Sequence, residues 1–264
     1  MRLPLLPASL IATALVLAGT IPPAFAQAPA QAPAQAPAPA PTPGPYKPLA
    51  VTLPQPLNDP SFEAFRKQLG EIAKKKDRAA LARLVATSFF WVPEDTDMAD
   101  KSKPAIDNVA KAMGLDGADA AGWETLANFA AETTAMPDPQ HSGAVCSPAE
   151  PGFDDKAADE LANATQTDAS DWVFPIRDGV EVREAAKQDA PVVEKLGVFL
   201  VRVLPDDSPA NAVLAAFVKV MTPSGKIGYV PTETVLPIGG EQLCYIKEGS
   251  NWKVAGFYGG EPSQ

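Results

Sequence analysis

Apolar residues recur at helical spacing from residue 59 onward. Asp59 and Pro60 supply a capping residue followed by proline at the first helical position. The residues after them form one apolar stripe at spacings of three and four: Phe62, Phe65, Leu69 and Ile72. Asp77 can cap a second helix, which carries Leu81 and Leu84. The pattern therefore predicts two consecutive amphipathic helices at the start of the folded chain.

The next segment breaks the helical period. Residues 88–92 read Ser-Phe-Phe-Trp-Val, an aromatic and β-branched run stopped by Pro93, and they predict a strand. Helical spacing then returns in three stretches, at 104–113, 123–130 and 153–164. The large aromatic residues of this part are expected to form a core. Residues 59–170 are therefore predicted to form a helical α+β unit with a short sheet.

Between residues 171 and 238 the period shortens to the alternation typical of β-strands, with turn residues between short runs. A hairpin pattern follows, with strands expected at 243–247 and 252–258. Because an isolated hairpin is marginally stable in water, it needs a partner, and the strand at 88–92 is the best candidate. We expect the hairpin, within residues 241–264, to complete the helical unit, so that the alternating segment interrupts that unit.

The first 58 residues show neither the helical period nor the alternation of a strand. The features of a cleavable secretory signal occupy residues 1–26: a positive start, an apolar run, and small residues at Ala24 and Ala26, with Gln27 as the first mature residue. An uncleaved anchor helix is the alternative, but prolines within the apolar run disfavour it. The sequence therefore predicts an exported protein, periplasmic or secreted.

Residues 27–58 are rich in proline and alanine and offer little apolar surface to bury, so they predict a disordered linker. Alternating prolines favour an extended spacer over a Pro-rich docking ligand. No later apolar run approaches the roughly 18 residues of a membrane span. We therefore expect no membrane insertion after signal cleavage.

Charge narrows the choice of partner. The chain has 22 basic and 32 acidic residues, and loss of Arg2 with the signal leaves a net charge of −11. A surface this acidic disfavours nucleic acid and anionic membrane faces, because the electrostatic contribution would be repulsive. It would suit a basic partner, such as a cell-wall hydrolase.

The chain offers little catalytic chemistry. Cys146 and Cys244 form an even pair, which in an exported protein is ordinarily a disulfide, the alternative being two buried thiols. His141 is the single histidine and lies only five residues before Cys146, whereas nucleophilic cysteines usually take their histidine from a distant element. No metal-ligand spacing is present. We expect no catalytic residue, no metal and no cofactor.

The alternating segment, residues 171–238, resembles the bacterial SH3 family over about a quarter of the chain. The resemblance rests on five short runs in order: Gly179–Arg183, Ala190–Gly197, Val201–Leu204, Phe217–Val220 and Gly225–Val230. In these runs Val180 and Val182 alternate inward and Gly225 allows a tight hairpin turn. Two departures stand out, because the family's usual Ser-Gly-Pro is Glu-Ala-Ala at 184–186 and its usual tryptophan is Phe217.

The resemblance implies a small β-barrel without catalytic groups, of the kind that binds cell-wall glycan or peptide, or an envelope protein. Tyr229 is its most tempting ligand contact, with Phe217 beside it in the pattern and Trp252 and Tyr258 in the closing hairpin as further aromatic candidates. The competing interpretation is that the ring of Tyr229 fills the barrel.

The predicted fold class is α+β: a helical N-terminal unit with a short sheet, plus a small SH3-like β-barrel. The leading function is an exported, non-catalytic binding or scaffolding protein of the bacterial envelope. One alternative is a periplasmic inhibitor or stress protein that binds a basic partner. The other is a cone-type α+β enzyme, since the opening helices and the closing strand resemble the ends of nuclear-transport-factor-two-like cones. Its acid–base carboxylates could be Glu94, Asp95 and Asp97.

Overall fold

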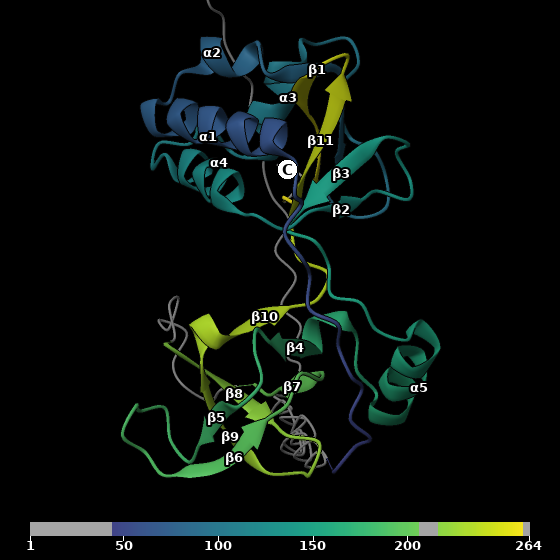
Figure 1. The fold of residues 1–264 in the computed structure, drawn as a ribbon, viewed down its shortest axis with the longest axis vertical. Helices are drawn as coiled ribbons and strands as arrows, with labels where there is room; N and C mark the ends of the chain where they lie inside the picture. The colour runs from purple at the N-terminus through teal and green to yellow at the C-terminus, as the bar shows by residue number, and fades with distance from the viewer. Residues whose placement is uncertain (1–43, 206–215, 261–264) are drawn as a thin grey trace, which may run out of the picture. The chain divides into compact units, whose positions relative to one another are not determined.

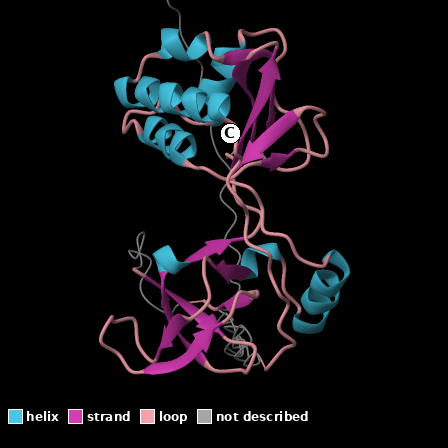
Figure 2. Ribbon diagram, in the orientation of Figure 1, coloured by secondary structure: helices cyan, strands magenta, loops and turns pink. Residues whose placement is uncertain are grey.

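A computed structural model of the protein describes residues 44–205 and 216–260. The expected signal sequence, with Ala24, Ala26 and Gln27, lies outside the described residues. Among the described residues, no helix is both long and apolar enough to cross a membrane. The chain forms two sheets, of five and seven strands, together with α-helices, so the α+β class is confirmed (Figure 2).

The opening helices begin where the capping residues predict. Helix α1 spans Pro60–Lys75, and the Asp59 carboxylate accepts hydrogen bonds from the backbone N–H groups of Ser61 and Phe62. Helix α2 spans Arg78–Ala82, with Asp77 accepting from the N–H of Ala80. These caps satisfy backbone donors that have no partner within a helix.

The first sheet joins strands from both ends of the described chain. Its order is β1-β12-β11-β3-β2, and its strands are β1 (Val85–Val92), β2 (Met136–Pro137), β3 (Ala144–Ser147), β11 (Gln242–Glu248) and β12 (Asn251–Tyr258). Strand β12 runs parallel to β1, with Trp91 opposite Phe257, while the other pairs are antiparallel. The closing hairpin thus lies beside the strand that the sequence analysis gave it as a partner.

Helices α1, α3 (Ala105–Ala112) and α4 (Ala121–Ala131) pack with this sheet. Figure 1 shows α1 and α4 lying side by side next to the strands. The core between them is made of large aromatic and aliphatic residues, including Phe62 and Leu69 of α1 and Trp91 of β1. Trp252 belongs to this core, with only 9% of its surface exposed. Little of the predicted ligand contact is therefore open to a ligand, because the alternation of β12 turns the ring toward α1.

The second sheet forms from the alternating segment. Its order is β10-β4-β7-β8-β9-β5-β6, and its strands are β4 (Trp172–Pro175), β5 (Val180–Arg183), β6 (Val192–Leu196), β7 (Val201–Val203), β8 (Phe217–Met221), β9 (Ile227–Pro231) and β10 (Val235–Pro237). Among the described residues the edge strands β6 and β10 do not pair, so the sheet is open and has more strands than the five expected.

One face of the second sheet is a valine core, which contains Val180, Val182, Val220 and Val230. The inward alternation of Val180 and Val182 is as the sequence predicts. Gly225, at φ +85°, lies in the turn between β8 and β9, where a residue with a side chain would be strained. The local strand and turn chemistry of this segment was therefore readable from the sequence.

Two boundaries differ from the expected ones. The linker predicted for residues 27–58 is not a free spacer from residue 44 onward, because Leu49 and Val51 are buried and Ala50 bridges Phe199. Helix α5 (Asp155–Thr165), assigned to the helical unit, packs through Leu161 in the same cluster as Leu49 and Val51.

That cluster also holds Trp172, Phe174 and Leu200, so it covers the second sheet at β4 and the start of β7, on the side opposite the valine core. The Tyr46 ring meets Trp172 edge-on at 5.1 Å. The physical reason for both corrections is the same: strand β4 places large aromatic residues on its second face, and that face recruits apolar residues from both flanking segments.

Candidate functional site

A polar cluster lies at the end of β12. The hydroxyl of Tyr258 donates to Asp138 Oδ2 at 2.9 Å, and His141 Nδ1 lies 2.7 Å from the same oxygen. The Asp138 side chain is only 3% exposed, whereas that of His141 is 35% exposed. The cluster therefore joins a buried carboxylate to a ring that reaches solvent.

The surrounding elements fix the imidazole. Its ring stacks on Phe90 with centroids 3.7 Å apart and planes 2° apart. Because an ionised carboxylate can only accept, Nδ1 carries the hydrogen of this contact, and Nε2 of that neutral tautomer is an acceptor with no hydrogen-bond partner among the described residues. Asp138 itself is held by the backbone N–H of Gln140. The arrangement is that of an oriented base, or of an acceptor for a ligand N–H or O–H group.

Hydrogen bonding determines the pKa of Asp138. Desolvation by burial raises this pKa, but hydrogen bonds from Gln140, His141 and Tyr258 outweigh it, and the net pKa is lowered. The same contacts act oppositely on Tyr258, whose pKa is raised by burial and by its hydrogen bond to the carboxylate. Asp138 is thus an anion and Tyr258 a neutral phenol at neutral pH.

A hollow of about 280 Å³ adjoins the cluster and is lined in part by Asp138, Tyr258, Glu150 and Cys146. Burial raises the pKa of the Glu150 carboxyl, although its Oε2 accepts the backbone N–H of Gly239 at 3.1 Å. Two carboxyl groups whose pKa values are displaced in opposite directions therefore face one small cavity. This is the combination that acid–base chemistry uses.

The predicted disulfide between Cys146 and Cys244 is confirmed, with the two Cα atoms 4.0 Å apart. The residues stand directly opposite each other on β3 and β11. Asp138 offers an oxygen within 4.8 Å of both sulfur atoms, so the three residues could be grouped as metal ligands. Because the two sulfur atoms are bonded to each other in the disulfide, neither is available as a thiolate ligand.

The predicted ligand contacts lie in different places. Tyr258 joins the polar cluster, whereas Tyr229 and Phe217 lie half-buried on the second sheet. Tyr229 does not fill the valine core, because its neighbour Val230 takes that side and strand alternation turns the tyrosine to the opposite face.

On that face Tyr229 stands between two cations: Lys219 is opposite it on β8 and Arg183 is opposite it on β5. Phe217 and Pro231 form the next pair of β8 and β9 on the same face. Directly opposite residues have side chains within contact range, so these residues make one surface, which we call the Tyr229 face.

The acidic residues proposed from the sequence play other roles. Asp97 accepts the backbone N–H groups of Trp91 and Ala99 and pairs with Lys101 at 2.8 Å, so it stabilises a loop. Glu94 and Asp95 are exposed and lie in the same loop. The sequence analysis missed Asp138, although Asp-Pro-Gln-His at 138–141 could have suggested a turn that brings Asp138 to His141.

Comparisons with known proteins name no relative. No family model matches the chain, and no curated protein matches it significantly. One solved structure, described as a calcium/calmodulin dependent protein kinase II association domain from Xanthomonas campestris, aligns over 81% of this chain and 97% of its own, with 8% identity and a TM-score of 0.25. Similarity at that level supports no conclusion about fold or function.

The lowered pKa of Asp138 makes a testable prediction about acid stability. A depressed folded pKa adds stability that is fully present above the unfolded value of about 4, and that stability is lost as pH falls through the folded pKa. We expect Asp138→Asn to lower the free energy of unfolding at pH 7 and to flatten its decline below pH 4. Urea unfolding from pH 7 to pH 2 measures both; a wild-type slope in the variant would contradict the assignment.

Proposed function

We propose that the protein is an exported, non-catalytic binding protein of the bacterial envelope, and that the Tyr229 face is its docking surface for cell-wall glycan and peptide. The expected signal sequence, the proline-rich segment and the resemblance of residues 171–238 to bacterial SH3 modules support this function. The observation that carries it is the tyrosine ring standing between two cationic side chains on a surface that the core does not use.

The chemistry of the Tyr229 face suits such a ligand. The accessible side of a half-buried aromatic ring can stack on a sugar ring, and cations on either side can receive carboxylates of a wall peptide. Arg183 already pairs with Glu181 at 2.6 Å, but Lys219 has no ion pair among the described residues. Lys219 is therefore the cation that a ligand carboxylate would engage.

Replacing Tyr229 tests this proposal. We expect Tyr229→Ala to weaken sedimentation of the full chain with purified peptidoglycan at least about tenfold, the loss of one anchoring aromatic residue. Its melting temperature should change little, because the ring lies outside the valine core. Leu236→Ala is the matched control, since Leu236 is an exposed apolar residue on edge strand β10.

Two outcomes would contradict the proposal: no retention of the wild-type chain on peptidoglycan, or equal retention of both variants. Retention by a column of basic periplasmic proteins in place of peptidoglycan would favour the inhibitor function, for which the net negative charge is the only support.

The second candidate is an acid–base enzyme, favoured by the oriented His141 ring and by the opposed pKa shifts of Asp138 and Glu150 beside one cavity. It would use His141 as the base, positioned by Asp138. A hydrolytic or isomerising activity that His141→Gln abolishes, in a variant that remains folded, would establish it.

A further inference from the structure

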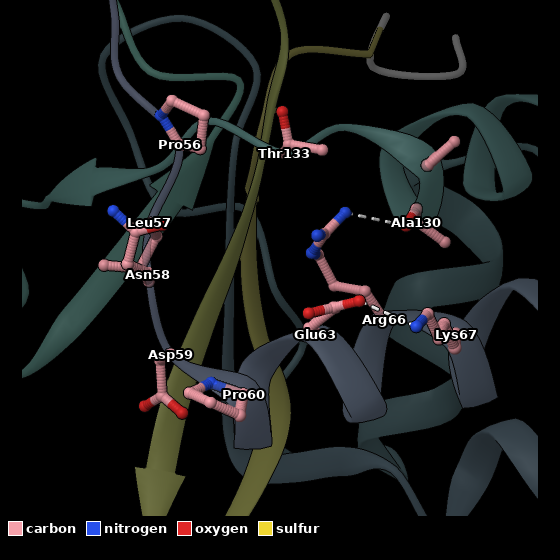
Figure 3. Close-up of a pocket in the computed structure, with 11 residues that line it drawn as sticks. Pro56, Leu57, Asn58, Asp59, Pro60, Glu63, Arg66, Lys67, Ala130 and Thr133 are labelled. Carbon is pink, nitrogen blue, oxygen red and sulfur yellow. Dashed lines mark hydrogen bonds and ion pairs between the residues drawn. The ribbon is translucent and has the colours of Figure 1, made fainter.

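A larger hollow lies in the helical unit, away from the polar cluster. It measures about 520 Å³ and is bounded by the chain segment before α1, the first turns of α1 and the end of α4. Figure 3 shows the Arg66 side chain rising from α1 into the space between Leu57, Thr133 and Ala130. Apolar atoms of Pro56, Leu57 and Ala130 form part of its wall.

Arg66 is a buried cation without a carboxylate partner. Only 8% of its surface is exposed, and it forms no ion pair among the described residues. Its Nη1 atom donates to the carbonyl oxygens of Ala130 and Glu132, at the end of α4, while Nε is buried with no hydrogen-bond partner. These bonds use one corner of the guanidinium and leave the Nη2 and Nε edge unpaired within the described part of the chain.

A buried charge is destabilising unless it is paired, so the unpaired edge needs an explanation. The nearby carboxylates do not supply one. Glu63 forms an ion pair with Lys67 at 2.7 Å. Hydrogen bonds to Asp59, above all from the Ser61 hydroxyl and then from the backbone N–H of Phe62, lower its pKa to about 2. The Glu132 carboxylate accepts hydrogen bonds from Thr133 and Thr134.

A second buried polar group without a hydrogen-bond partner among the described residues, the Tyr245 hydroxyl, lies close enough to Arg66 to feel its charge. This hydroxyl is fully buried, and the Tyr245 ring packs edge-on against Phe62 and Phe65 of α1. Burial raises the pKa of this phenol, while the charge of Arg66 acts to lower it. Tyr245 does not line the hollow, whereas Arg66 does, so the unpaired guanidinium edge is the donor that lacks an acceptor there.

We propose that this hollow binds the carboxylate of a small organic acid or of a peptide C-terminus, with Arg66 as the anchor. The carboxylate pairs with the free guanidinium edge, which gives Arg66 the counter-charge that the described chain does not provide. The body of the ligand lies against Pro56, Leu57 and Ala130. Asn58 and Thr133, whose side chains make no hydrogen bond with the described residues, line the hollow and offer it further polar groups.

This site does not depend on the proposed cell-wall function. It uses α1, α4 and the segment before them, whereas the Tyr229 face belongs to the second sheet. Peptidoglycan retention and carboxylate binding can therefore fail separately, and Tyr229→Ala should leave carboxylate binding unchanged.

Titration of the full chain with matched acids and amides tests the proposal. Hexanoate represents a free organic acid and acetyl-glycyl-alanine a peptide terminus; hexanamide and the peptide amide are the uncharged controls. Binding is followed by NMR at the indole N–H of Trp252, which donates to Ser61 in the first turn of α1. We expect at least one acid to bind about tenfold more tightly than its amide, and the stronger acid identifies the source of the carboxylate.

Variants show whether Arg66 is the anchor. Arg66→Gln should weaken the acid about tenfold or more and leave the amide unchanged, while Lys67→Gln, which removes an exposed charge, should have little effect. Because Arg66 also bonds the end of α4, circular dichroism must show that its variant is folded; if it is not, Asn58→Leu and Thr133→Val serve as milder tests. Equal binding of acid and amide, no binding of either acid, or unchanged acid affinity in the folded variants would overturn the proposal.

Discussion

Removing the Cys146–Cys244 disulfide should lower the free energy of unfolding by about 4 to 5 kcal/mol, because it closes a loop of 98 residues and loops of that size restrict the unfolded chain strongly. The bond also links β3 to β11, and both cysteines belong to a buried cluster that contains Phe90 and Val92. Urea unfolding with and without a reductant, followed by tryptophan fluorescence, measures the difference.

The double variant Cys146→Ala, Cys244→Ala separates the crosslink from effects of the reductant. It should show the same loss as the reduced protein, and reductant should then change nothing further. A loss below about 1 kcal/mol in both experiments would contradict the prediction. It would mean that the unfolded chain stays compact between the two cysteines even without the disulfide, so that the crosslink restricts it little.

Trp252→Ala should destabilise the helical unit by about 3 to 5 kcal/mol, the range for removing a large buried aromatic ring. The ring packs at 4.8 Å from Phe62, and its Nε1 donates to the Ser61 hydroxyl at 3.0 Å. The variant therefore leaves a cavity at the contact between α1 and β12. Thermal and urea unfolding measure the loss.

Trp252→Phe is the matched control, because it keeps an aromatic ring and removes the N–H donor. We expect it to lose about 1 to 2 kcal/mol, mainly through the unpaired Ser61 hydroxyl and the smaller ring. Wild-type stability in Trp252→Ala, together with weaker retention on peptidoglycan, would return Trp252 to the role of a ligand contact.

The polar cluster shows why the candidate site could not be located from the sequence. Asp138 and His141 are three residues apart, but their third partner, Tyr258, lies 117 residues beyond His141. Tyr258 was named as a candidate for its aromatic ring, with no indication of its neighbours. The neighbours depend on the register of β11 against β3 and of β12 against β1, which is a property of the folded sheet.

The Tyr229 face illustrates the same limit. Alternation established that Tyr229 and Val230 point to opposite sides of β9, but not which side would become the core. The sheet settled that choice, because the valines of β5, β8 and β9 meet on one face. Arg66 was read only as part of a helix, and its missing counter-ion became visible when α1 was packed against the end of α4.

The sequence by itself determined the features that depend on near neighbours: the caps of α1 and α2, the strand periods, the turn at Gly225 and the parity of Cys146 and Cys244. Tertiary structure alone decided that β12 runs parallel to β1, that the second sheet recruits α5 and residues 44–53, and which groups surround Asp138 and Arg66. The reason is physical: caps, turns and periodicity act over a few residues, whereas burial and unpaired charge depend on which distant segments fold against each other.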